Sequence, residues 1–276
     1  MRAKEGTFKG AGGLELYHLA WLPDGEPKAV LILVHGLGEH CGRYNNLVNH
    51  LVPRGDAIYS FDHRGHGRSP GPRGHVDRWK DFRADVRRLL SRVQAEQPGV
   101  PVFLFGHSMG GLIALNYVLH DPSGLRGIIA SAPGLDTGGL SPVMLRLARV
   151  LSRVAPRLPL PSGLDPEGIS RDTEVIERYK QDPLTHSKGT PRAATEGTDA
   201  VRWTNAHAAD LDLPLLLYYG TADRLVPPAA ARRFFERVTH PDKTLHEYEG
   251  TYHEPHNDLD KAQVFADIER WLEARV

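Results

Sequence analysis

The sequence has very little cysteine. Its 276 residues include only Cys41, so no internal disulfide can form, which suits a reducing compartment. Its apolar runs, such as Ala29–Val34 and Leu213–Tyr219, are far shorter than the roughly 20 residues that a membrane-spanning helix needs. The charged residues at the start of the chain have no apolar stretch behind them. We therefore expect no signal peptide and a cytoplasmic location.

The sequence also lacks an excess of charge of either sign. Its 34 Lys and Arg residues balance 34 Asp and Glu residues, and the pI is near 7.3. A chain with this balance has no broad electrostatic attraction for nucleic acid, so we predict no nucleic-acid partner.

A metal-binding pattern is missing as well, although 15 histidines are present. The run His253-Glu254-Pro255-His256 differs from H-E-x-x-H, and a proline there opposes a helix that would carry both ligands. We predict no metal and no organic cofactor. Cys41 has no partner histidine or carboxylate in the sequence pattern, so we interpret it as a small packed residue.

Short apolar runs alternate with amphipathic segments along most of the chain. The runs are rich in Val, Ile, Leu, Phe and Tyr, which is typical of strands buried on both faces. This alternation predicts an α/β fold with a mostly parallel sheet and helices on both faces, and Leu14–Trp21 is expected to add an antiparallel edge strand. The predicted strands are Ala29–Val34, Ala57–Phe61, Pro101–Phe105, Gly127–Ser131, Pro214–Tyr219 and Thr244–Tyr248, and the predicted helices are Asp81–Val93, Met109–Leu119, Ala229–Val238 and Val264–Leu272.

Residues 134–207 break this alternation. They are rich in Pro, Gly and Arg and contain no clear strand. They follow a predicted strand, so we expect them to cover the strand ends as a cap (lid). The expected organisation is a core of residues 1–133 and 208–276 with a cap of residues 134–207.

The clearest motif is Gly106-His107-Ser108-Met109-Gly110. It follows an apolar strand and precedes a helical pattern, as G-x-S-x-G does in the α/β-hydrolase fold, where a sharp turn exposes the serine and needs neighbours without a Cβ. We predict Ser108 as the nucleophile. The structural alternative is a tight glycine-rich turn with an incidental serine. A serine here also argues against a dehalogenase with an aspartate nucleophile.

A serine nucleophile needs a base, and the base needs a carboxylate that orients it. In this fold the acid follows a late strand and the histidine follows the last one. Asp223 and His253 occupy these places, whereas Asp210 and Asp212 precede their strand. We predict Asp223 as the acid and His253 as the base. The structural alternatives are a turn or N-cap carboxylate and a surface histidine.

Two backbone N–H groups must also face the oxyanion that forms during acyl transfer. Met109, directly after the nucleophile, is predicted to supply one. Leu37, between two glycines after an early strand, is predicted to supply the second. The alternative for Leu37 is a plain strand-to-helix loop.

At these motifs the chain resembles the monoacylglycerol lipases and lysophospholipase-like hydrolases. His35-Gly36-Leu37-Gly38-Glu39-His40, followed by Arg43-Tyr44, is similar to that family's H-G-x-G-E-H-x-x-R-Y, and residues 62–69 are similar to its D-x-R-G-H-G-x-S. The pair of Glu39 and Arg43 narrows the superfamily to this family. The resemblance covers nearly the whole chain and is weakest in Lys188–Thr198, where Gly, Thr and Pro replace helix-friendly residues.

The resemblance implies a carboxylic ester hydrolase that cleaves monoacylglycerols or lysolipids through an acyl-enzyme. It also implies that the alcohol part of the substrate lies near Glu39, Arg43 and His256, where charge-assisted hydrogen bonds can hold hydroxyls. An ion pair that braces the loop is the alternative for Glu39 and Arg43. For His256 the alternative is a place behind the site or in solvent.

Other functions fit the same three residues. A serine peptidase of the prolyl-aminopeptidase type and a thioesterase share them, and a peptidase needs cap carboxylates for a substrate ammonium. Four such carboxylates are available: Glu167, Glu174, Glu177 and Glu196. A non-catalytic receptor or scaffold is an alternative of a different class, but such proteins commonly lose one of the three residues.

The expected cap begins with an amphipathic pattern. Ser141-Pro142 is typical of a helix start, and a basic amphipathic helix over the site predicts transient contact with a lipid surface. The alternative is that the apolar face packs on the core and lines an acyl tunnel. The apolar face consists of Leu140, Val143, Met144, Leu147, Val150, Leu151 and Val154, and the basic stripe consists of Arg146, Arg149, Arg153 and Arg157.

Overall fold

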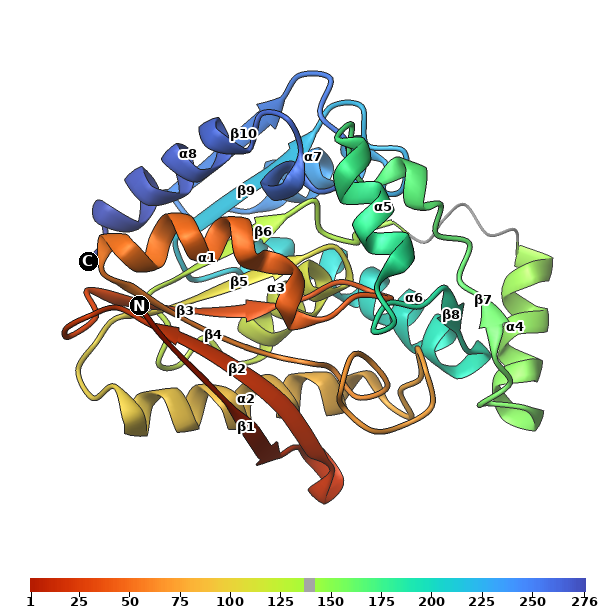
Figure 1. Cartoon of the computed structure of the whole chain (residues 1–276). Helices are drawn as coiled ribbons and strands as arrows, with labels where there is room; N and C mark the ends of the chain where they lie inside the picture. Colours follow the sequence, from red (N-terminus) through yellow and green to blue (C-terminus); the bar gives the residue numbers. More distant parts are fainter. Residues whose placement is uncertain (137–141) are drawn as a thin grey trace.

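The computed structural model describes residues 1–136 and 142–276. At its centre is an eight-stranded sheet in the order β1-β2-β4-β3-β5-β6-β9-β10 (Figure 1). From β4 to β10 neighbouring strands pair in parallel, whereas β1 with β2 and β2 with β4 pair antiparallel. The strands of this sheet are β1 (Arg2–Lys9), β2 (Glu15–Leu22), β3 (Ala29–Val34), β4 (Asp56–Phe61), β5 (Val102–His107), β6 (Gly127–Ser131), β9 (Leu215–Gly220) and β10 (Lys243–Tyr248).

Helices cover both faces of the sheet. One core cluster lies between the sheet and α1 (Asn45–Leu51) with α8 (Lys261–Glu273), and Trp271 is one of its large side chains. The other cluster lies under α2 (Trp79–Glu96), α3 (Met109–His120) and α7 (Pro228–Arg237), with Phe82 and Phe234 in its interior. The predicted fold class, a mostly parallel sheet between two helical layers, is confirmed.

The prediction of an edge strand at Leu14–Trp21 needs a correction. The strand is antiparallel, as expected, but β1 covers it and forms the edge of the sheet. The sequence pattern missed β1 because its side chains are mostly exposed and four of its eight residues are charged. A strand solvated on this scale carries no apolar run.

Residues 134–207 join β6 to β9, and their described part, residues 134–136 and 142–207, lies beyond the carboxyl ends of the parallel strands (Figure 1). We call this stretch the inserted segment. It contains a short antiparallel pair that the sequence did not indicate, β7 (Leu160–Pro161) with β8 (Lys188–Gly189). Its helices are α4 (Pro142–Val154), α5 (Thr173–Gln181) and α6 (Pro191–Ala206).

Helix α6 begins inside the stretch in which the family resemblance is weakest. Thr190 caps it, because its hydroxyl accepts a hydrogen bond from the N–H of Ala193 at 3.3 Å, and Pro191 occupies the first turn. Threonine and proline are suited to these two positions. The residues that looked unfavourable for a helix therefore define where it starts.

Short 3-10 helices complete the loops. They are η1 (Ala11–Gly13), η2 (Cys41–Tyr44), η3 (Val52–Arg54), η4 (Pro166–Gly168), η5 (Ala208–Asp210) and η6 (Pro255–Asn257). Two of them, η2 and η6, follow loops at the carboxyl ends of strands β3 and β10. None of the helices in the described part of the chain is both long and apolar enough to cross a membrane.

Candidate active site

Ser108 lies on a sharp turn between β5 and α3. Its backbone has φ 54° and ψ −119°, a strained conformation for a residue with a side chain. The turn is tight: a Cβ on Gly106 would lie 2.3 Å from the carbonyl oxygen of Gly110, and one on Gly110 would lie 2.0 Å from that of Val34. The two glycines of the motif are therefore required for the turn that presents Ser108.

The structure brings Ser108, His253 and Asp223 together from three loops. The Nε2 atom of His253 lies 2.9 Å from Oγ of Ser108, and its Nδ1 atom lies 2.7 Å from Oδ2 of Asp223. The other oxygen of Asp223 accepts hydrogen bonds from the N–H groups of Leu225 and Val226, at 2.8 and 2.9 Å. Since an ionised carboxylate only accepts, Nδ1 carries a proton and Nε2 is free to accept one from Ser108.

Two opposing effects act on the pKa of His253. Burial lowers it, but the charge and hydrogen bond of Asp223 raise it, with help from Glu254 and Glu39. The net pKa of His253 is above its ordinary value of 6.5. Asp223 therefore stabilises the protonated ring that acyl transfer would form.

The N–H groups of Leu37 and Met109 remain available for an oxyanion. In the described chain, neither donates to another group of the protein, and Leu37 lines the pocket beside Ser108. The loop that carries Leu37 is held at Gly36, whose N–H donates to Oε1 of Glu39 at 2.6 Å. Its Gly38 has φ 76°, and a Cβ there would lie 2.3 Å from the carbonyl oxygen of His186.

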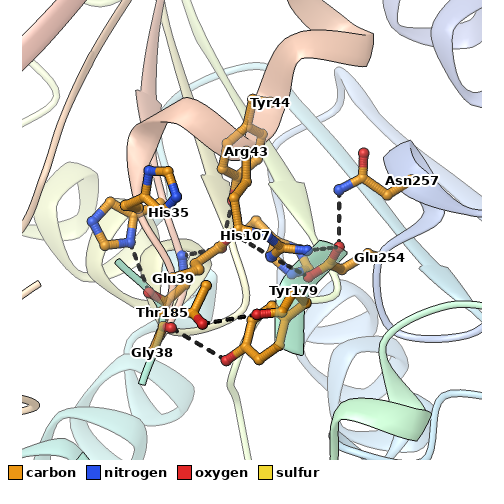
Figure 2. Close-up of polar contacts among 12 residues, drawn as sticks. His35, Gly38, Glu39, Arg43, Tyr44, His107, Tyr179, Thr185, Glu254 and Asn257 are labelled. Atoms are coloured by element: carbon orange, nitrogen blue, oxygen red, sulfur yellow. Dashed lines mark hydrogen bonds and ion pairs between the residues drawn. The ribbon is translucent and has the colours of Figure 1, made fainter. Parts of the chain in front are cut away.

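Glu39 and Arg43 belong to a buried charge cluster that also contains Glu254 (Figure 2). Arg43 donates to Oε2 of Glu39 at 2.8 Å and makes two bonds to Glu254, at 2.7 and 2.9 Å. Oε1 of Glu39 also accepts from the hydroxyl of Tyr44 at 2.7 Å. The aromatic ring of Tyr179 lies 4.6 Å from the guanidinium carbon of Arg43. All three charged residues line the pocket, so the cluster that braces the loop is also part of the pocket wall.

The pKa values of the two carboxyl groups in this cluster are shifted in opposite directions. Burial raises the pKa of Glu39, with a further contribution from Glu254, and Arg43 opposes it. Burial also raises the pKa of Glu254, but the charge of Arg43 and its two hydrogen bonds outweigh this effect and lower the pKa to about 2. Glu254 is therefore the permanently ionised partner of Arg43.

The structure places His256 behind the pocket wall. Its side chain is fully buried, stacks on the ring of Tyr44 with centroids 4.9 Å apart, and is not among the residues that line the pocket. Burial lowers its pKa to about 4, so the ring is neutral. His256 packs behind the charge cluster, because the 3-10 turn that begins at Pro255 points it inward.

Sequence reasoning missed several residues that lie at the site. Glu254 was given no role in the site, although its place directly after His253 brings it to the pocket. Tyr179 comes from α5, and no local pattern marks it. It is more than 130 residues in sequence from the loop that carries Leu37, which we call the oxyanion loop. His107 also lines the pocket, with its ring centroid 4.8 Å from that of His253. Within residues 1–136 and 142–276, no three His, Cys, Asp or Glu side chains converge as a metal site would require.

A mostly parallel sheet with a strained serine turn, a histidine and a buried aspartate defines the class of α/β-hydrolases. Residues 25–260 match the family model described as "Serine aminopeptidase, S33". The monoacylglycerol lipase of Mycolicibacterium smegmatis is 36% identical over 97% of this chain and 96% of its own length. The chain belongs to the monoacylglycerol lipase family.

Solved structures agree with this assignment. The crystal structure of Paleococcus ferrophilus monoacylglycerol lipase superposes with a TM-score of 0.87 at 36% identity, over 95% of this chain and all of that one. A soluble variant of the Saccharomyces cerevisiae monoglyceride lipase, solved with a substrate analog, gives a TM-score of 0.85 at 27% identity, over 99% and 95% of the two chains.

Proposed function

We propose that this protein hydrolyses monoacylglycerols to fatty acid and glycerol, with Ser108, His253 and Asp223 as its catalytic residues. The observation that carries the proposal is the chain of two short hydrogen bonds from Ser108 through His253 to Asp223, 2.9 and 2.7 Å long. Family membership supports the substrate class, because the relatives are named for monoacylglycerols.

The first half of the reaction transfers the acyl group to the serine. Nε2 of His253 takes the proton of Ser108 while Oγ attacks the ester carbonyl carbon. The carbonyl oxygen becomes negative and is held by the N–H groups of Leu37 and Met109. The protonated His253 then gives its proton to the glycerol oxygen as the ester C–O bond breaks, which leaves an ester of Ser108.

The second half repeats these steps with water. Nε2 of His253 takes a proton from a water molecule, whose oxygen attacks the acyl carbon of the Ser108 ester. The fatty acid leaves as the proton returns to Oγ of Ser108. Asp223 holds the ring of His253 in one tautomer through both halves. No metal and no organic cofactor takes part in this sequence of steps.

Glu39 and Arg43 face the place where the glycerol part sits, and their charges bear on the choice of substrate. Two carboxylates, Glu39 and Glu254, share the single cation Arg43. An excess of negative charge repels a phosphate group and accepts hydrogen bonds from free hydroxyls. This favours a neutral glyceride over an anionic lysophospholipid.

The four carboxylates that the sequence offered for binding a substrate ammonium do not support a peptidase. Each of the four carboxylates that the sequence offered for this role has a partner elsewhere: Glu167 and Glu177 with Lys180, Glu174 with Arg178, and Glu196 with the N–H of Trp79. None of the four lines the pocket beside Ser108. A thioesterase shares all the steps above and is decided by the assay below.

We propose residues 134–207 as a cap on a core of residues 1–133 and 208–276. The pocket beside Ser108 is small, with a cavity volume of about 30 Å³. Its walls include Leu164, Pro166 and Ile169 of the inserted segment. An acyl chain therefore needs these walls to move outward.

The outer helix of this cap offers a lipid-binding surface. On α4, four apolar side chains point to solvent: Val143 is 71% exposed, Leu147 59%, Val150 54% and Val154 74%. These four side chains are therefore not packed on the core, as the alternative for this face would require. Arg146, Arg149 and Arg153 are exposed on the same helix. Leu140, Ser141 and the side chain of Met144 lie outside the described residues. Transient docking on a lipid surface follows, and a peripheral protein of the cytoplasm fits this role.

The experiment compares kcat/KM of the purified protein on a monoacylglycerol, a lysophospholipid, a triacylglycerol, an acyl thioester and an aminoacyl amide. We expect the monoacylglycerol to be fastest and the lysophospholipid of the same acyl chain to be at least about tenfold slower, the effect of roughly 1.4 kcal/mol of charge repulsion. Faster turnover of the aminoacyl amide or the thioester would replace the proposal with a peptidase or a thioesterase.

A further inference from the structure

Glu254 connects the two loops on which the proposed reaction depends. It follows His253 directly in the sequence, and its side chain is only 4% exposed. Its backbone is held as well, since its N–H donates to the carbonyl of Ile169 at 2.8 Å and its own carbonyl accepts from the N–H of Asn257 at 2.8 Å. The position of its carboxylate is therefore coupled to the position of the neighbouring histidine.

A continuous path of buried hydrogen bonds runs from the oxyanion loop to Glu254 (Figure 2). The N–H of Gly36 donates to Glu39 at 2.6 Å, Arg43 donates to Glu39 at 2.8 Å, and the same guanidinium makes two bonds to Glu254. A two-bond contact between guanidinium and carboxylate fixes direction as well as distance. The path therefore fixes the distance and orientation between the loop that carries Leu37 and the loop that carries His253.

Neighbours on both sides keep this contact in place. The side-chain amide of Asn257 donates to Oε2 of Glu254 at 2.8 Å and is itself held by Asn46 at 2.9 Å. The ring of Tyr179 covers the guanidinium of Arg43. A buried charge with all its partners satisfied has one low-energy arrangement, so the cluster is rigid where the reaction needs fixed geometry.

We propose that Glu254 is a positioning residue, which through Arg43 and Glu39 fixes His253 relative to the N–H of Leu37. This rests on the proposed function of Ser108 and His253. The base and the oxyanion donors must match the same transition state, and a misplacement of about 1 Å can cost on the order of a hundredfold in rate. Glu254 acts through its neighbours and does not touch the reacting atoms.

The charge of Glu254 also reaches His253. The groups that interact with His253 are Asp223 from the loop after β9, Glu39 from the loop after β3, Ser108 and His107 from the serine turn, and Glu254 and His256 from its own loop. Among them Asp223, Glu254 and Glu39 raise the pKa of His253. Removal of the negative charge at Glu254 is therefore expected to lower the pKa of the base.

The test uses Glu254→Gln and Glu254→Asp, with Asp85→Asn as the matched control. Asp85 is equally buried and also makes two bonds to one arginine, Arg64, both 2.9 Å long, but it lies on α2 and does not line the pocket. For each protein we would measure kcat and KM on a p-nitrophenyl ester, the pH dependence of kcat/KM, thermal unfolding, and labelling of Ser108 by a phosphonate.

For Glu254→Gln we expect kcat to fall about tenfold to a hundredfold with KM within about threefold, and the acid limb of kcat/KM to move to lower pH. Glu254→Asp keeps the charge but is one methylene shorter, so the acid limb should return toward that of the wild type while kcat stays low. Asp85→Asn should lose thermal stability and keep kcat and the acid limb.

Each outcome decides between the ideas. Wild-type kcat and an unchanged acid limb in a folded Glu254 variant would show that Glu254 only stabilises the fold, and the proposal would be wrong. An equal loss of kcat in Asp85→Asn would also overturn it, because the loss would then follow stability. If the wild type itself is not labelled at Ser108, the proposed function fails, and that result is distinct from a labelled wild type with an unaffected Glu254 variant.

Discussion

Two parts of the proposed cap, α5 with the loop after it and α4, differ in what they contact. The end of α5 lies on the oxyanion loop: the hydroxyl of Tyr179 donates to the carbonyl of Gly38 at 3.2 Å, and the N–H of His186 donates to the same oxygen at 2.9 Å. Asp182 lies 2.8 Å from Nε2 of His40 in the adjoining loop. This part of the inserted segment is structurally part of the site.

Helix α4 has different surroundings. It packs on α6, where the hydroxyls of Ser152 and Thr195 lie 3.0 Å apart and Arg192 donates to the carbonyl of Ser152 at 2.8 Å. Four of its apolar side chains, Val143, Leu147, Val150 and Val154, face solvent. The inserted segment therefore contains an inner part, α5 and the loop after it, that contacts the site. Its outer part, α4, is exposed to solvent. Substitutions in the inner part should change the chemistry, and those in the outer part should change only the access of lipid.

The largest expected effect is at Ser108, the proposed nucleophile, and the effects in both parts of the cap are compared with it. Ser108→Ala should lower ester hydrolysis by about 10⁴-fold to 10⁶-fold and leave the thermal unfolding temperature unchanged, since the turn depends on Gly106 and Gly110. A serine-reactive phosphonate should label the wild type and not the variant. Activity of the variant within tenfold of the wild type would exclude Ser108 as the nucleophile.

The pH dependence should follow His253, which must be neutral to accept a proton. Burial lowers its pKa and Asp223 raises it, with a net result above 6.5. Activity should therefore fall as the pH drops through a value above 6.5, because the ring becomes protonated. Asp223→Asn removes the main raising influence, so the acid limb should move to lower pH and the rate should fall about 10⁴-fold. An acid limb that stays in place in this variant would show that another group titrates.

The residues that the sequence identified are those whose position follows from local pattern. Ser108 lies in a five-residue motif between a strand and a helix, and Asp223 and His253 follow the carboxyl ends of late strands. Parallel strands bring such residues to one edge of the sheet whatever the packing details. The structure accordingly brings all three within hydrogen-bond distance.

The residues that the sequence missed depend on contacts between distant segments. Tyr179 reaches the site only because α5 folds back over the loop after β3. Glu254 is next to His253 in the sequence, but its contact with Arg43, 211 residues away, has no local signal. His256 was predicted in the site from the family pattern, but residue spacing does not predict the direction of a side chain inside a 3-10 turn. Strand β1 was missed because an exposed strand has no apolar run.

The inner part of the cap is tested at Tyr179. Tyr179→Phe loses the hydroxyl bond to Gly38 but keeps the ring over Arg43, and Tyr179→Leu loses both. One hydrogen bond of about 0.5–1.5 kcal/mol corresponds to a loss of about twofold to tenfold in kcat, with a larger loss for leucine. Tyr59→Phe is the control, because its hydroxyl bonds Glu96 and Gln97 away from the pocket. Equal kcat in all three variants would mean that the inner end of the cap does not shape the site.

The outer part is tested at α4, where the expected effect on chemistry is smallest. Leu147→Ser with Val150→Ser should leave kcat/KM on a soluble short-chain p-nitrophenyl ester within about twofold, because neither side chain contacts the site. Binding to vesicles should fall by at least about tenfold, since each apolar side chain transferred into lipid contributes roughly 1.5–3 kcal/mol. Leu259→Ser is a matched control. Leu259 is 59% exposed, like Leu147, but it follows η6 and lies outside the proposed cap. Replacing Arg146, Arg149 and Arg153 by Gln should weaken binding only to anionic vesicles, and added salt should remove that difference because it screens exposed charges. Co-sedimentation with neutral and anionic vesicles measures both terms. If the Leu147/Val150 variant binds vesicles as the wild type does, the exposed stripe is not a lipid contact; if it loses activity on the soluble ester, α4 is coupled to the site and the division of the cap into an inner and an outer part fails.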